Sequence, residues 1–306
     1  MTMRQIHLYC PSSQDLIEMV AEKRGWKWNG KMLQEDSMSQ SKRFPIFSVA
    51  DGVTLVVKPG QQYPCPSGAG ALAGIVCESL IHNAEEEYPR FSRNSIQKVF
   101  RLANKEAEEY NKKHGRNKKT INYFDLDYFC ATVAVAVIRE QKLFYGVIGD
   151  SRVMVRNRNG EVKCKSFDQV AHIEKAVAAM MKNPQPQEKK VLQHKNFRNK
   201  VASDGKLLGY GVVDGEKEAL QYVESGVIDI EKGDQIFVYT DGLESYFELA
   251  EFNNLFRSWP TKRKISGFLK KFKEENIPTH SNQDELYKFL YKYTAEGSMM
   301  AINIGE

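Results

Sequence analysis

The chain has 306 residues, of which 42% are hydrophobic and 27% charged, a balance that is typical of globular proteins. It excludes collagen-like and wholly disordered chains. The 44 Lys and Arg residues exceed the 39 Asp and Glu residues by 5, and both kinds are spread along the sequence. We therefore expect no nucleic-acid partner.

Two further features concern the compartment. No apolar run reaches the roughly 20 residues that a membrane-spanning helix needs, and the first residues lack the apolar stretch of a secretory signal. The five Cys residues form no Cys-x-x-Cys pair, so the sequence favours reduced thiols over disulfides or a zinc site. We expect a cytoplasmic protein without a membrane contact.

In chain order, the apolar pattern alternates between strands and helices. Residues 44–58 predict a strand, a loop at Asp51-Gly52 and a second strand, and residues 67–87 and 95–114 predict two amphipathic helices. Residues 129–156 predict three antiparallel strands with a turn at Glu140-Gln141. The remaining expected elements are a helix at 166–182, strands at 220–230 and 235–240, helices at 248–259 and 262–275, and a last strand at 298–304.

Strands from both ends of the chain must share sheets in this order of elements. The sequence therefore predicts a single α+β domain over residues 1–306, with helices packed on a β-sandwich. Residues 183–205 are polar and basic and show no period, which predicts a long surface excursion inside the domain.

Four acidic residues stand at the edges of predicted strands: Asp36, Asp51, Asp150 and Asp241. A carboxylate beside a glycine at a strand end can point oxygen ligands into one pocket. Oxygen ligands suit hard ions such as Mg²⁺ or Mn²⁺, whereas zinc would call for His or Cys. Each Asp-Gly pair alone is also a common turn signal, and Asp150 is equally compatible with a turn.

In combination these residues resemble the metal-dependent protein phosphatases, the PPM or type 2C serine/threonine class. The segments FSVADG, FYGVIGDSRVMVRNRNG and GVIDIEKGDQIFVYTDGLES carry the resemblance, which extends from about Trp28 to the C-terminus. It implies a four-layer αββα sandwich of two mainly antiparallel sheets flanked by helices. It also implies two Mg²⁺ or Mn²⁺ ions, whose bridging water attacks phosphoserine or phosphothreonine in a phosphoprotein substrate.

The resemblance implies a role for each matching residue. Asp51 would bridge both metals, the Gly52 carbonyl would complete one metal shell, and Asp241 would bind one metal. Asp36 would act through ordered waters or as a direct ligand. The family's phosphate-binding Arg is replaced here by Lys31, which lacks the bidentate fork of a guanidinium.

Three positions depart from the family pattern. Val53, Thr54 and Leu55 follow the first Asp-Gly where relatives have His or Met and then glycines. The last metal Asp aligns with Ala295, so the neighbouring Glu296 is the expected ligand. Asp150 matches a third, weaker metal site of some relatives, although the residue four after Asp241 is Ser245.

Two alternatives stay open on the sequence. Lys31, the loop after Gly52 and the Ala295-Glu296 pair also suit a catalytically weak or inactive binding protein that keeps the phosphatase fold. Such a protein should not hold a metal pair at Asp51 and Asp241. A basic module for RNA or membrane surfaces has only the net charge of +5 and the lysine strings in its favour, without interleaved aromatic residues.

Overall fold

The computed structural model of the chain describes residues 2–11, 34–55, 66–180, 186–278 and 295–305, with the single positions 285, 289, 292 and 293. Within these residues the strands form two five-stranded sheets in which all neighbours are antiparallel. Residues 56–65, which include most of the second strand expected after Asp51-Gly52, lie outside the described residues.

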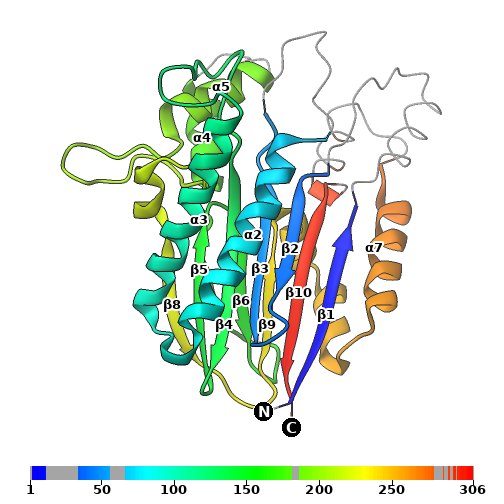
Figure 1. The fold of residues 1–306 in the computed structure, drawn as a ribbon. Helices are drawn as coiled ribbons and strands as arrows, with labels where there is room; N and C mark the ends of the chain where they lie inside the picture. The colour runs from blue at the N-terminus through cyan, green and yellow to red at the C-terminus, as the bar shows by residue number, and fades with distance from the viewer. Residues whose placement is uncertain are drawn as a thin grey trace.

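The first sheet has the order β1 (Met3–Cys10), β10 (Gly297–Ile304), β9 (Gln235–Tyr239), β6 (Arg152–Arg156) and β7 (Val162–Lys165). The second has the order β2 (Asp36–Gln40), β3 (Ile46–Gly52), β4 (Ala131–Arg139), β5 (Lys142–Ile148) and β8 (Glu224–Asp229). The last strand, β10, therefore lies between the first strand and β9, so both ends of the chain share one sheet, as expected (Figure 1).

Helices cover the outer faces of both sheets (Figure 1). The α-helices are α2 (Gly68–Glu87), α3 (Arg93–Lys113), α4 (Ala171–Met180), α5 (Pro186–Phe197), α6 (Ala250–Leu255) and α7 (Lys262–Asn276). Short 3-10 helices are η1 (Tyr88–Arg90), η2 (Lys217–Tyr222), η3 (Asp241–Glu248) and η4 (Phe256–Ser258).

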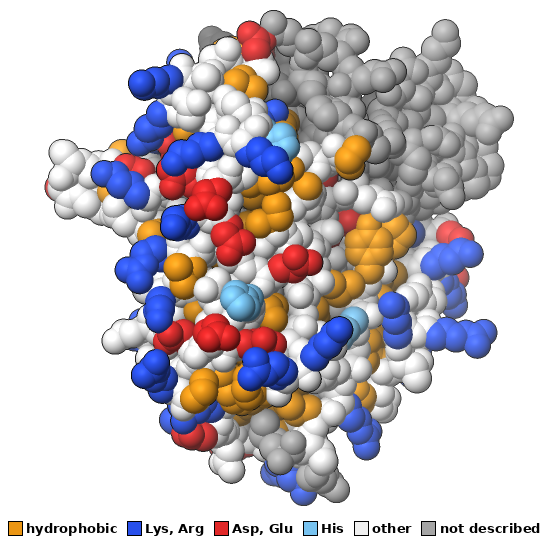
Figure 2. All heavy atoms as spheres, in the orientation of Figure 1, with side chains coloured by type: hydrophobic (Ala, Val, Ile, Leu, Met, Phe, Trp, Pro, Cys, Tyr) orange, Lys and Arg blue, Asp and Glu red, His pale blue; other side chains and the backbone are white. Residues whose placement is uncertain are grey.

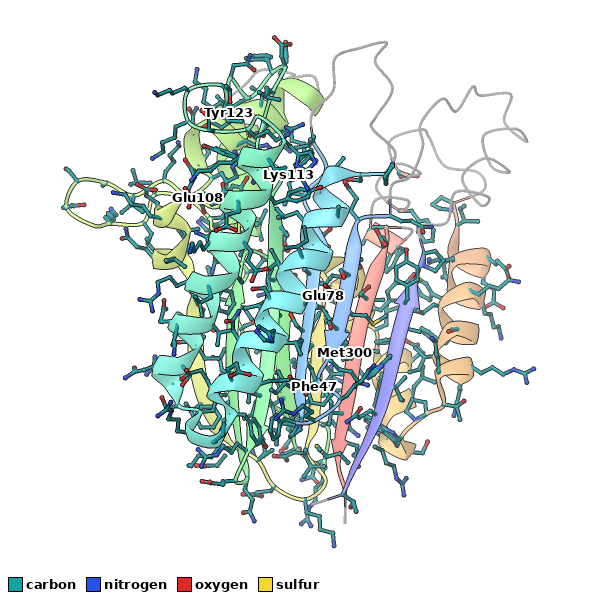
Figure 3. All side chains as sticks on the ribbon, viewed as in Figure 1. Phe47, Glu78, Glu108, Lys113, Tyr123 and Met300 are labelled. Carbon is teal, nitrogen blue, oxygen red and sulfur yellow. The ribbon has the colours of Figure 1, made fainter. Side chains whose placement is uncertain are left out.

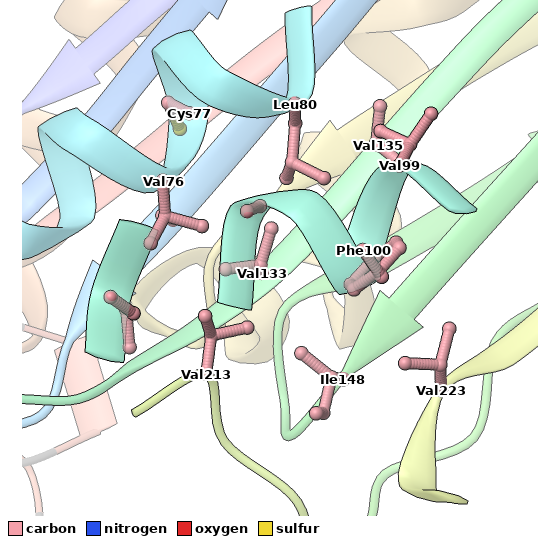
Figure 4. Packing of buried hydrophobic residues seen from close by; sticks show 14 of the residues in the cluster. Val76, Cys77, Leu80, Val99, Phe100, Val133, Val135, Ile148, Val213 and Val223 are labelled. Carbon is pink, nitrogen blue, oxygen red and sulfur yellow. The ribbon is translucent and has the colours of Figure 1, made fainter. Parts of the chain in front are cut away.

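Three apolar clusters separate the four layers. The first lies between α2, α3 and the second sheet and includes Leu80, Phe100 and Val135 (Figure 4). The second lies between the two sheets, where Phe47 of β3 and Met300 of β10 belong to one cluster (Figure 3). The third packs the first sheet against η3, α6 and α7. The expected αββα sandwich is confirmed.

The surface and the turns agree with the sequence analysis. Lys and Arg side chains are intermixed with Asp and Glu over the face formed by α2 and α3 (Figure 2). The predicted turn joins β4 to β5, with φ angles of 52° at Glu140 and 60° at Gln141, the left-handed values of a tight hairpin. Among the described residues no helix is long and apolar enough to cross a bilayer.

The segment 183–205 differs from the expectation. We expected a surface excursion without regular structure, but α5 occupies residues 186–197. Its apolar residues form no clear stripe, so the sequence pattern did not predict a helix here. Leu192 and Phe197 of α5 pack on a small apolar cluster that includes Ile173 of α4 and Val212. Helix α5 is therefore packed against the rest of the domain.

Buried charges hold the C-terminal end of α5. Arg198, expected among the surface cations, is 1% exposed and donates to both carboxylate oxygens of Asp127, at 2.6 and 3.0 Å. The Nδ1 of His194 lies 2.8 Å from Asp127 Oδ2, and Arg198 Nε lies 3.6 Å from Asp214 Oδ2. Burial would raise the pKa of Asp127, but the Arg198 guanidinium holds it well below its usual range. Burial lowers the pKa of His194 to about 4, so the imidazole is neutral at pH 7.

Removing the charge of Asp127 should therefore destabilise the domain. Asp127→Asn leaves Arg198 buried without its full counter-charge, and breaking a buried pair in this way costs about 3–5 kcal/mol. We expect this loss in the free energy of unfolding from urea titration. Asp229→Asn is the matched control, because Asp229 pairs with Lys142 while its side chain is 80% exposed. An equal shift of both midpoints would contradict the structural role of the buried network.

Candidate active site

Strand ends of both sheets meet at one cavity of about 470 Å³. Asp51 and Gly52 are the last residues of β3, Asp150 lies in the turn after β5, and Asp241 follows β9 at the start of η3. All four residues line the cavity. The structure thus brings together three of the four predicted aspartates and the predicted carbonyl ligand.

The fourth aspartate, Asp36, lies beside the cavity at the start of β2. The register of β2 and β3 sets Asp36 directly opposite Asp51. Its Oδ2 accepts a hydrogen bond of 2.8 Å from Thr240 Oγ1. Because Thr240 directly precedes Asp241, this bond connects the edge of the second sheet to the end of β9 that carries Asp241. Asp36 is therefore at the same edge but is not among the residues that line the cavity.

Both Asp-Gly pairs need their glycine for a close approach of backbones. A Cβ on Gly52 would lie 2.6 Å from the carbonyl carbon of Ala69, at the start of α2. A Cβ on Gly242 would lie 1.7 Å from the carbonyl oxygen of Glu296, just before β10. No side chain fits at such distances. The glycines therefore fix where Asp51 and Asp241 stand relative to their neighbours.

The carboxylates of the site oppose one another's ionisation. Burial raises the pKa of Asp51, and the charges of Asp241, Asp36 and Asp150 raise it further. Burial also raises the pKa of Asp36, with a further contribution from Glu296. Like charges that are close together in a buried site favour protonation unless a cation joins them. The site is therefore electrostatically suited to a cation.

Asp150 gives an independent test of whether a cation fits. Burial raises its pKa to about 6, followed by the nearby charge of Asp168. Its Oδ1 is buried and has no hydrogen-bond partner in the part of the chain that the structure describes. A buried acceptor without a partner costs free energy that a ligand can recover. With the other oxygen donors around the cavity, this residue fits a hard divalent ion.

The donors do not form a finished metal shell. Among the described residues no group of three Asp, Glu, His or Cys side chains stands in an arrangement that would hold an ion. Asp36 accepts a hydrogen bond from Thr240, and Glu296 accepts one from Tyr9. Metal binding therefore requires carboxylates to turn toward a common ion.

Glu296, the expected substitute for the last metal Asp, lies half-buried beside the start of β10. Its Oε1 accepts a hydrogen bond of 2.6 Å from the Tyr9 hydroxyl, and its Oε2 accepts one from the backbone N–H of Glu35. Burial raises the pKa of Glu296. Its carboxylate thus connects Tyr9 of β1 with Glu35, the residue before β2. Glu296 is not among the residues that line the cavity.

The loop after Gly52 has its own partners in place of glycines. The N–H of Val53 donates to the Cys130 carbonyl at 2.9 Å, and Thr54 Oγ1 donates to Glu35 Oε2 at 2.6 Å. Glu35 is 3% exposed and also accepts from Ser67, the residue that caps α2. The departure from the family pattern thus comes with a buried carboxylate that binds the loop. Lys31 lies outside the described residues.

Four residues of the cavity come from α5 and were not assigned to the site on the sequence: Lys189, Lys190, Gln193 and His194. On the sequence these residues belong to the polar and basic segment 183–205, and none of them stands out as a ligand or catalytic group. Two features of the sequence could have indicated this helix and its face. They are Pro186 at the start of the helix and the spacing of four residues between Lys190 and His194. Both signals were weak because the helix has no clear apolar stripe.

The comparisons place this site in a family. The profile of the protein phosphatase 2C family matches residues 29–290. Among solved structures, the serine/threonine phosphatase PstP/Ppp of Mycobacterium tuberculosis is 14% identical, with a TM-score of 0.55 and full coverage of both chains. PppA of Pseudomonas aeruginosa, a regulatory component of its T6SS, is 11% identical, with a TM-score of 0.55 and coverage of 99% of this chain and 98% of that chain.

A third structure, the catalytic domain of PstP in complex with two manganese ions, is 13% identical, with a TM-score of 0.53 and coverage of 99% of both chains. At these identities the structural matches establish the fold. No curated protein matches the sequence. Because the family profile spans most of the sequence and the resemblance seen in the motifs agrees with it, the chain belongs to the protein phosphatase 2C family of protein serine/threonine phosphatases.

Proposed function

We propose that the chain removes phosphoryl groups from phosphoserine and phosphothreonine of phosphoproteins at the cavity formed by Asp51, Asp150 and Asp241. The observation that carries the proposal is the convergence of these oxygen donors at the strand ends of a protein phosphatase 2C domain. Within the described residues they line one cavity, and the buried Oδ1 of Asp150 has no hydrogen-bond partner there. This arrangement supports a phosphomonoester hydrolase.

The chain's own groups would hold two Mg²⁺ or Mn²⁺ ions. Asp51, the Gly52 carbonyl and Asp241 are the proposed direct ligands, and Asp36 acts directly or through water. When bound, the two ions supply an acidified water as nucleophile and neutralise charge on the phosphoryl group. Asp150 is the proposed ligand of a third, weaker ion. The related PstP domain, which was solved with two manganese ions, supports this choice of metal.

The remaining roles follow from position and charge. The negative cavity repels a phosphoryl dianion until cations are bound, so the carboxylates make substrate binding depend on metal. The leaving alkoxide takes a proton from solvent or from a nearby acid. The described part of the cavity shows no Cys or Ser nucleophile among its lining residues, in agreement with hydrolysis without a covalent phospho-enzyme. Lys31 stays a proposed contact to the substrate phosphate, from its position in the sequence.

Three further points concern the domain organisation, the substrate and the inactive alternative. Residues 1–306 act as one domain, with residues 183–205 as an insertion beside the active site. The substrate is a phosphoprotein, without a nucleic-acid or membrane partner, and the cytoplasmic location remains a prediction from composition. Nothing in the comparisons favours the inactive alternative, and the loop after Gly52 has a hydrogen-bonded path that leaves Asp51 in the cavity.

Metal dependence provides the first test of this function. Hydrolysis of an aryl phosphate should require added Mn²⁺ or Mg²⁺ and stop with a chelator. Asp51→Asn and Asp241→Asn should each lower turnover by more than about 100-fold, since changes outside a ligand shell already cost roughly 10- to 100-fold. Circular dichroism should show an intact fold in both variants.

Asp229→Asn is the control for this test, because Asp229 lies at the end of β8 with its side chain exposed. It carries the same change of charge and should hydrolyse the aryl phosphate at the rate of the unmodified chain. Turnover that continues undiminished in chelator would refute the two-metal mechanism.

Glu296 provides a second test, which separates a metal ligand from a structural brace. Glu296→Ala should weaken Mn²⁺ binding measured by calorimetry, whereas Glu296→Asp should keep part of the affinity because a carboxylate remains. Tyr9→Phe removes the hydrogen bond of 2.6 Å to Glu296 but leaves its carboxylate, so Mn²⁺ affinity should not fall.

Two outcomes would show that Glu296, the ligand expected from the sequence, does not bind the metal. The first is equal Mn²⁺ affinity in the unmodified chain, Glu296→Ala and Glu296→Asp. The second is a loss in Tyr9→Phe as large as that in Glu296→Ala, which would assign the effect to the contact between β1 and β10.

A further inference from the structure

Helix α5 brings a cation into the acidic cavity. Lys190 lines the cavity together with Asp51, Asp150 and Asp241, although it comes from a different part of the fold. Its side chain is half-buried. Within the described residues no ion pair engages its ammonium group. A cation therefore lies against the proposed metal centre with its donors available to a ligand.

The position of Lys190 is fixed by the buried end of the helix. Lys190 and His194 are four residues apart and thus share one face of α5. His194 is 2% exposed and is held by Asp127, which in turn is held by Arg198. The face that carries Lys190 is therefore directed toward the body of the domain. Val191 beside it is also buried, at 4% exposure.

The electrostatics agree with this placement. Burial lowers the pKa of Lys190, while the charges of Glu35 and Asp51 act in the opposite direction. The ammonium thus stands within electrostatic reach of carboxylates from β3 and from the residue before β2. Lys195, on the same helix, is exposed and does not line the cavity. The two lysines differ in environment although they share an element.

We propose that Lys190 binds the phosphoryl group of the substrate from the side opposite the aspartates. The proposal rests on the proposed function, because it places a phosphomonoester in this cavity. An ammonium donates three hydrogen bonds and suits a phosphate oxygen as a point charge. Two divalent ions would neutralise the carboxylates, and Lys190 would then face the phosphate oxygens directed away from the aspartates. This residue would complement the cation expected at Lys31.

Calorimetry with inorganic phosphate tests the inference on the full chain loaded with Mn²⁺. Lys190→Gln should weaken phosphate binding by about 10- to 100-fold, the usual effect of losing a charge-assisted hydrogen bond. Lys190→Met, which keeps the apolar stem, should show the same loss. Lys190→Arg should stay within about threefold of the unmodified chain, because the charge is retained. Lys195→Gln, with the same change of net charge on the same helix, should bind phosphate normally.

Kinetics give a second readout. Lys190→Gln should raise the KM for an aryl phosphate more than it lowers kcat, as expected for a contact present in both ground state and transition state. Phosphate affinity equal to that of the unmodified chain in both Lys190→Gln and Lys190→Met would overturn the inference. So would an equal loss in Lys195→Gln, or tighter Mn²⁺ binding in Lys190→Gln without a loss of phosphate affinity.

The inference and the proposed function fail separately. An unmodified chain that shows no metal-dependent hydrolysis would count against the function, while phosphate titration of the Mn²⁺-loaded protein would still decide whether Lys190 binds the anion.

Discussion

The pairing of β2 with β3 sets two carboxylates, Asp36 and Asp51, directly opposite each other at a sheet edge. Like charges in this position are unfavourable, and burial of the pair makes the repulsion stronger. The sandwich tolerates the arrangement because β3 contributes apolar residues to the clusters on both faces of the sheet, and Met38 of β2 packs on the cluster between the sheets. The cost of the carboxylate pair is what makes the edge receptive to cations. The register of β2 and β3 therefore determines that the two carboxylates lie together, because a slip by one residue would turn either side chain to the other face of the sheet.

A second set of charges works in the opposite way. Asp127, Arg198 and His194 form a buried group in which the charge of Asp127 is matched and its oxygens are hydrogen-bonded. This group stabilises the position of α5, whereas the group at the cavity stays short of positive charge. Within the described residues, a matched group of buried charges and a group of unmatched carboxylates thus lie next to each other, and His194 of α5 belongs to the first and lines the cavity of the second. Such a contrast is characteristic of a site that stores electrostatic free energy for a ligand.

Much of this structure could be predicted from the sequence, because the elements of the sandwich follow simple periods. Residues 129–156 alternate clearly, and the three strands and the turn at Glu140-Gln141 lie where we predicted them. The expected antiparallel pairing of all three is wrong for the third strand, because β6 belongs to the first sheet and pairs with β7 and β9 instead of β5. Asp51, Asp150 and Asp241 were accessible because each stands where a strand ends. The position of Lys190 in the cavity could not be predicted, because Lys190 lies on a helix without an apolar stripe. That helix is held through His194 by Asp127, which precedes Lys190 by 63 positions. Contacts of that range leave no local period.

The place of β10 in the sheet bears on the order in which the domain folds. This strand follows all other described strands in the chain, yet it lies between β1 and β9 in the sheet. Until it is present, β1 and β9 lack their common neighbour, and Gly242 lacks the Glu296 backbone against which it packs. Pairings between such distant segments form late in folding. The Asp241 side of the cavity therefore takes its final form only after β10 has paired with β9.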